Sequence, residues 1–96
     1  SQKMRTEFDK DRVIFHFEGP VTVELPDDAL QVPSDRPISE IVLNFQGVKL
    51  ISSLVIANLI ELLNREKSRK IRMVNMGHDM KTLFDRTGLS TFAEID

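Results

Sequence analysis

The second half of the chain alternates short apolar segments with amphipathic ones, and this order constrains the fold more than any other feature. Residues 41–45 (Ile-Val-Leu-Asn-Phe) are apolar at nearly every position, which is typical of a parallel strand covered by helices. The next segment has apolar side chains at helical spacing, which predicts one buried face made of Val55, Ile56, Leu59, Ile60, Leu62 and Leu63. Residues 71–76 predict another strand, and the turn at 77–79 leads into a second helix that Gly88 ends. This order predicts an α/β layer of parallel strands joined by right-handed crossovers.

The first half of the chain predicts a β-hairpin followed by irregular structure. Residues 4–8 and 13–17 flank the polar turn at 9–12, and the second of these strands is apolar enough for an interior position. Residues 21–25 predict a short strand or an extended segment. Three prolines interrupt residues 26–37, which predicts a loop with at most one helical turn. At the other end of the chain, residues 92–95 predict a last strand.

Composition excludes several classes of function. The 96 residues are enough for one domain, and their net charge of −2, with acids and bases interspersed, gives no electrostatic reason to expect nucleic acid or an anionic membrane as partner. Cysteine is absent, so disulfides and cysteine-bound metals are excluded. The longest apolar runs are too short to span a bilayer and no signal-peptide pattern is present, so we expect a cytoplasmic protein.

Two adjacent serines, Ser52 and Ser53, lie where the first long helix should begin. A helix N-terminus has free backbone N–H groups and the positive end of the helix dipole, which suit a hydroxyl, a phosphate or an acidic group of a partner. The simplest expectation is that one serine is the N-cap, which stabilises a helix by about 1 kcal/mol relative to alanine. The alternative is phosphorylation of one of them.

These elements resemble the STAS family, which includes bacterial anti-sigma-factor antagonists and the cytoplasmic domains of sulfate transporters. The resemblance rests on the strand at 41–44, the approach Gly-Val-Lys-Leu-Ile at 47–51, the helix at 56–63 and the closing Phe-Asp-Arg-Thr-Gly-Leu at 84–89, in that order. It implies one STAS-like domain over residues 1–96, a mixed sheet with helices packed on one face. The proline-broken region after Gly19 implies that the first family helix is short or missing. The last family helix is expected to be absent.

The chain departs from the family pattern at the corner between strand and helix. Aligned without gaps, Leu54 occupies the position of the serine that a partner kinase phosphorylates in this family, and Ser53 and Ser52 precede it. Val55 and Ala57 replace the two glycines that follow, and Asn44 replaces an aspartate. Leucine cannot accept phosphate, so the family's switch should not operate at residue 54. Ser53 and then Ser52 remain as phosphorylation candidates, and Leu54 is expected either on a docking face or in the core.

The resemblance implies a non-catalytic protein-interaction module in bacterial regulation. The expected contact residues are Ser52, Ser53, Leu54, Val55 and Ala57 at the corner, with Gly19, Asn75 and His78 in neighbouring loops. The implied partner is an anti-sigma factor with a serine-kinase fold, or a related phosphatase or signalling protein. One alternative is a subunit or domain of a membrane transporter complex. Another is homodimerisation through an exposed sheet edge or the degenerate first-helix region.

An enzymatic function is a further alternative, with His78 as base and Asp79 as its orienting partner. Such residues more often begin a helix, where Asp suits both the cap and the dipole. His16 lies in an apolar strand and is expected to be a packed or edge histidine. The sequence contains no glycine-rich phosphate loop, HExxH motif, nucleophile elbow or metal-ligand cluster. We therefore expect no catalytic residue, metal or cofactor.

Overall fold

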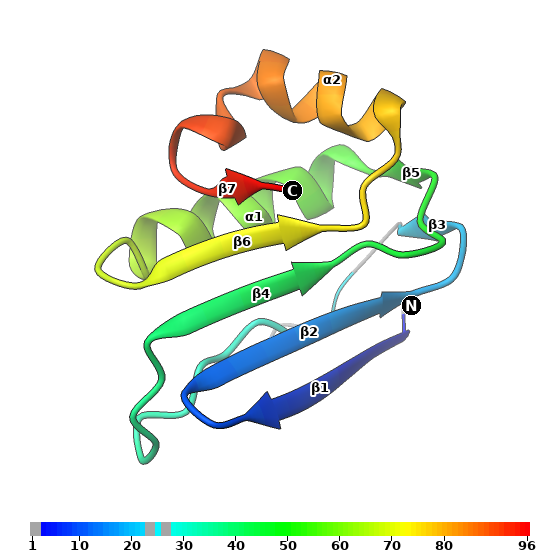
Figure 1. Ribbon diagram of the computed structural model, residues 1–96. Helices are drawn as coiled ribbons and strands as arrows, with labels where there is room; N and C mark the ends of the chain where they lie inside the picture. The colour runs from blue at the N-terminus through cyan, green and yellow to red at the C-terminus, as the bar shows by residue number, and fades with distance from the viewer. Residues whose placement is uncertain (1–2, 23–24, 26–27) are drawn as a thin grey trace.

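The computed structural model describes residues 3–22, 25 and 28–96, and its main element is a five-stranded mixed sheet in the order β1-β2-β4-β6-β7 (Figure 1). The strands are β1 (Lys3–Asp9), β2 (Arg12–Glu18), β4 (Glu40–Asn44), β6 (Lys70–Val74) and β7 (Glu94–Ile95). β1 pairs antiparallel with β2, and all other pairings in this sheet are parallel. A small parallel pair, β3 (Val21–Thr22) with β5 (Leu50–Ile51), lies beside it. The predicted α/β class with a mixed sheet is confirmed.

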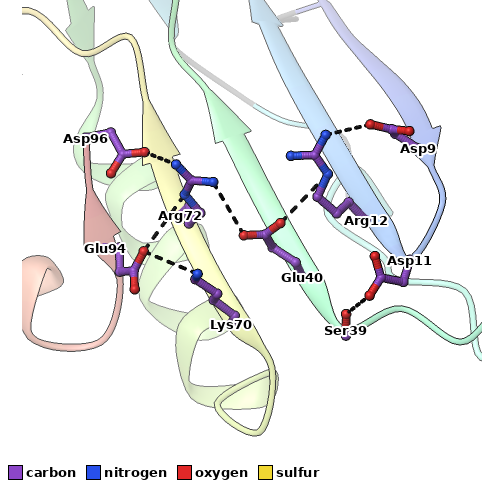
Figure 2. Close-up of polar contacts among 9 residues, drawn as sticks. All are labelled: Asp9, Asp11, Arg12, Ser39, Glu40, Lys70, Arg72, Glu94 and Asp96. Atoms are coloured by element: carbon purple, nitrogen blue, oxygen red, sulfur yellow. Dashed lines mark hydrogen bonds and ion pairs between the residues drawn. The ribbon is translucent and has the colours of Figure 1, made fainter.

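The helices cover one face of the sheet. They are α1 (Ser53–Arg65) and α2 (His78–Thr87), and a short 3-10 helix, η1 (Leu89–Thr91), follows Gly88, which has a φ of 80°. Alternate residues of β2 are buried, and the register aligns Val13 with Ile41 and Ile41 with Ile71 on the same face. These side chains form one core cluster with the buried residues of both helices. The opposite face, toward the viewer in Figure 2, carries charged side chains and no helix.

Three phenylalanines connect the sheet to α2 within this core. Phe45, which follows β4, is fully buried; its ring stacks on Phe17 at 4.9 Å between centroids and meets the edge of Phe84 at 5.6 Å. Aromatic pairs in such geometries stabilise a fold by about 0.5–1.5 kcal/mol beyond the area that they bury. Phe45 therefore joins β2, β4 and α2 in a single contact.

A row of charged residues crosses the open face of the sheet with alternating sign (Figure 2). In order across the sheet its members are Asp9, Arg12, Glu40, Arg72 and the pair Glu94 and Asp96. Arg12 lies 2.5 Å from Asp9 and 3.8 Å from Glu40, and Arg72 lies 3.7 Å from Glu40 on the other side. The row gives the uncovered face a charged surface, so this face needs no covering layer.

Several details of the sequence analysis need correction. The helical face predicted for α1 is narrower than expected, because Ile60 is 48% exposed while Val55, Leu59, Leu62 and Leu63 are buried. The last strand contains only Glu94 and Ile95; Phe92, expected to begin it, is 67% exposed after η1. The loop predicted for 26–37 needs no correction, because residues 28–37 contain turns and no helix; residues 23–24 and 26–27, part of the expected short strand and helical turn, lie outside the described residues.

Replacing Phe45 by alanine should destabilise the fold by about 4 kcal/mol, because it leaves a cavity at the contact between β2, β4 and α2. Phe92→Ala is the matched control; since Phe92 is exposed, its effect should stay within about 0.5 kcal/mol. Urea unfolding of both variants measures the difference. Equal losses of unfolding free energy in the two variants would contradict the central position of Phe45.

The hydrogen bond from Arg12 and the charge of that guanidinium lower the pKa of Asp9 below its ordinary value of 3.8. A lowered folded-state pKa stabilises the protein above the ordinary value, and this stabilisation is lost as pH falls through the folded-state pKa. Asp9→Asn should therefore lose less stability than the wild type as pH falls below about 4. Thermal unfolding over this pH range tests the prediction. Asp28→Asn is the control, because Asp28 is exposed and makes none of the ion pairs found among the described residues.

Candidate partner-docking surface at the strand-to-helix corner

The corner is the segment from Gly47 to Ala57, where the chain passes from β4 through β5 into α1. Gly47 has a φ of 82°, a conformation that favours glycine, and turns the chain after β4. The backbone N–H groups of Lys49 and Leu50 then donate to the carbonyl of Pro20 at 2.7 and 3.2 Å. These bonds and the β3–β5 pairing attach the corner to the loop after β2, which contains Gly19.

Ser52 is the N-cap of α1. It has extended backbone angles (φ −80°, ψ 164°), and its hydroxyl accepts a hydrogen bond from the N–H of Val55 at 3.2 Å. Its carbonyl accepts the first helical bond, from Ile56, at 3.0 Å. Of the two serines, the first therefore fulfils the expected capping role, and Ser53 begins the helix with an exposed side chain.

The packing of α1 against the core determines which side chains of its first turn face solvent. Leu54 is 66% exposed, whereas Val55 is fully buried beneath it. Of the two expectations for Leu54, the core position is therefore wrong. Ala57 is exposed one turn further along. Val55 supports this surface from within the core and presents no atoms to a partner.

Leu50 is a member of this surface that the sequence analysis missed. It is 63% exposed, whereas its neighbour Ile51 packs against the core. Side chains of a strand alternate between faces, and in β5 this alternation leaves Leu50 outside. Leu50 and Leu54 thus present two large apolar side chains on either side of the N-cap. The sequence contains no signal for this exposure, because alternation from Val48 and Lys49 would place Leu50 on the buried side, and β5 is only two residues long.

The predicted loop residues lie at the same end of the sheet. Figure 1 shows that both helices begin at the end where β2, β4 and β6 finish, with β5 beside them. Gly19 (φ 101°) and Asn75 (φ 61°) are exposed turn residues that follow β2 and β6. His78 is the exposed first residue of α2. The carboxyl-end surface, as we name it, consists of Gly19, Leu50, Ser53, Leu54, Ala57, Asn75 and His78.

A row of hydrogen bonds joins three strand ends next to this surface. The N–H of Gln46 and the amide of Asn75 both donate to Oδ1 of Asn44, at 3.1 and 2.8 Å. The amide nitrogen of Asn44 therefore faces His16 and donates to Nδ1 at 2.9 Å. This assigns the ring proton to Nε2, which donates to Glu7 at 2.7 Å. Both ring nitrogens of His16 are engaged, in agreement with its expected structural role.

The geometry offers little to the enzymatic alternative. His78 and Asp79 are both exposed at the start of α2, and among the described residues no hydrogen bond joins their side chains. The described residues also include no group of three or more His, Asp or Glu side chains suited to a metal ion.

A second exposed apolar region lies near the other end of α1. Ile60 and Phe92 flank a hollow of about 170 Å³, which Thr87, Gly88 and Leu89 complete. The apolar pattern predicts Ile60 on the buried face of the helix and Phe92 in the last strand, so the sequence does not indicate this hollow.

The one-sided layer of parallel strands joined by crossover helices defines the fold class of this domain as α/β. The sequence profile of the STAS domain family matches residues 3–96, and the chain therefore belongs to the STAS family. STAS domains are generally non-catalytic interaction modules. A search of curated proteins gives no match. Among the described residues, no helix has the length and apolar character needed to cross a membrane.

The capping role separates the two serines experimentally. Ser52→Ala removes the acceptor for the Val55 N–H and should destabilise the protein by about 1 kcal/mol. Ser53→Ala changes an exposed first-turn residue and should have an effect within about 0.5 kcal/mol. Chemical denaturation of both variants distinguishes them. A larger loss for Ser53→Ala would contradict the assignment of the cap.

Proposed function

We propose that this STAS domain is a regulatory module of the anti-sigma-factor-antagonist type in bacterial transcription control. It docks through the carboxyl-end surface onto a regulator with a serine-kinase fold. Phosphorylation at residue 54 does not regulate this docking, because a leucine occupies the position of the family's phosphoserine. The exposure of Leu54, at 66%, is the observation that carries this proposal.

The proposed contact combines apolar and polar elements. Leu50 and Leu54 supply exposed apolar surface, and exposed apolar surface rimmed by polar residues is a feature of protein–protein contact sites. The N–H groups of Ser53 and Leu54 belong to the first turn of α1, where amides have no partner within the helix. No acidic side chain occupies that turn. The helix dipole therefore favours an acidic or carbonyl group from the partner next to the leucines.

Phosphorylation, where it occurs, is proposed at Ser53 rather than Ser52. The side chain of Ser53 is exposed, whereas the hydroxyl of Ser52 accepts the capping bond. A phosphate at a helix N-terminus is tolerated by the fold, but it adds nearly two negative charges beside Leu54. It would therefore weaken an apolar contact at the carboxyl-end surface.

Leu54→Asp should weaken binding to a serine-kinase-fold anti-sigma factor at least about tenfold, because it places a charge at the centre of the apolar contact. Co-purification followed by isothermal titration calorimetry against candidate regulators measures this effect. Ile60→Asp is the matched control: Ile60 is an exposed apolar residue of the same helix outside the carboxyl-end surface. It should leave the affinity unchanged.

Equal affinity of Leu54→Asp and the wild type would overturn the proposed docking face. Capture by a transporter from membrane extracts, without binding to any kinase-type regulator, would favour the transporter-subunit alternative instead.

A further inference from the structure

We propose that this chain forms a two-fold symmetric homodimer by antiparallel pairing of β1 with β1 of a second copy, centred on Thr6. The pairing joins the two five-stranded sheets into one continuous sheet. The proposal is independent of the docking function, because β1 contains no residue of the carboxyl-end surface.

The outer edge of β1 is available for this pairing. β1 is the first strand in the sheet order, and among the described residues β2 is its only partner strand. Figure 1 shows β1 at the margin of the sheet, at the opposite side from β7. In an antiparallel pair, alternate residues turn their N–H and C=O groups away from the partner. An edge strand of seven residues therefore presents a row of backbone groups that a second strand can bind.

The sequence of β1 is complementary to itself in one register. Pairing about Thr6 places Arg5 opposite Glu7 of the second copy, Glu7 opposite Arg5, and Met4 opposite Phe8. Opposite charges thus meet on one face of the joined sheet, and apolar residues meet on the other. A centre at Arg5 or at Glu7 would place like charges opposite each other, and parallel pairing in register would align Arg5 with Arg5. Only the register centred on Thr6 avoids these repulsive pairs.

The charged side chains are already positioned for this contact. Arg5 lies 3.8 Å from Glu7 of its own strand and 3.9 Å from Glu18, and its side chain is 60% exposed. The side chain of Glu7 is 46% exposed and is also held by His16. In the dimer, Arg5 and Glu7 of the two copies form a square of four charges in which each neighbour has the opposite sign. Such a contact is isologous, as a two-fold axis requires.

The opposite face of β1 supplies apolar contacts. Met4 is half-buried against the core, and Phe8 is 38% exposed with the guanidinium of Arg36 4.0 Å above its ring. Each Phe8 would meet a Met4 across the new strand pair, and sulfur–aromatic contacts of this kind are favourable. Charged residues on edge strands usually prevent such pairing. In β1, by contrast, the two-fold axis places each of the charged residues Arg5 and Glu7 opposite a residue of the other sign.

A charge-swap experiment tests the proposal. Arg5→Glu alone makes every residue-5 to residue-7 pair acidic, and Glu7→Arg alone makes every such pair basic. Each variant should raise the dimer dissociation constant by roughly tenfold or more. An equimolar mixture of the two variants should form the heterodimer, in which all these pairs regain opposite charges. Analytical ultracentrifugation of each variant and native mass spectrometry of the mixture measure both effects.

Two further variants separate loss of pairing from loss of folding. The double variant Arg5→Glu with Glu7→Arg restores complementary pairs within one chain and should dimerise. Lys10→Glu is the matched control: Lys10 lies in the hairpin turn next to β1, and its charge reversal should leave dimerisation unchanged. The proposal is overturned if the wild type is monomeric at its solubility limit, or if Arg5→Glu and Glu7→Arg both dimerise as the wild type does.

Discussion

The parallel pairing of β4 with both β2 and β6 is the constraint on which the rest of the structure depends. Parallel neighbours cannot be joined by a tight turn, so the β4–β6 pair requires a crossover after β4, and the parallel β6–β7 pair requires one after β6. Because crossovers are right-handed and both proceed in the same direction along the sheet, α1 and α2 lie on the same face. Both helices then begin where the parallel strands end. The carboxyl-end surface is thus a consequence of the topology.

The side chains of β4 also make different interactions on the two faces of the sheet. Ile41 and Leu43 are fully buried against the helices, whereas Glu40 and Asn44 hold the two polar rows on the open face. Exposed ion pairs individually contribute at most about 1 kcal/mol, so the charged row is not the main source of stability. The charged row covers the open face with polar groups, whereas the apolar core cluster, which includes Phe45, holds the helices against the sheet.

Much of this fold follows from the sequence, because its main elements have clear periods. The hairpin, β4, β6 and both helices were predicted close to their observed bounds. The predictions failed where burial depends on tertiary geometry. Ile60 fits the apolar period of α1, but the buried stripe of that helix contains only Val55, Leu59, Leu62 and Leu63, and Ile60 is 48% exposed. Leu54 could not be assigned from the sequence, because it lies next to the predicted apolar face and the pattern does not show where that face ends. The burial of Val55, Leu59, Leu62 and Leu63 fixes the rotation of α1 about its axis and leaves Leu54 exposed.

In the proposed docking, the same rotation favours a fixed contact at this corner over a switched one. With the cap at Ser52, residue 54 points outward at the start of the helix, so any residue there dominates the local surface. A serine at this place can gain a phosphate and alternate between two surfaces, whereas a leucine presents the same apolar group in every state of the cell. Self-pairing through β1 uses the outer margin of the sheet, and no residue of the carboxyl-end surface belongs to β1. A dimer would then carry two docking surfaces. Once a partner with two binding sites had bound the first surface, the spacing of the two surfaces would set the effective concentration for binding to the second.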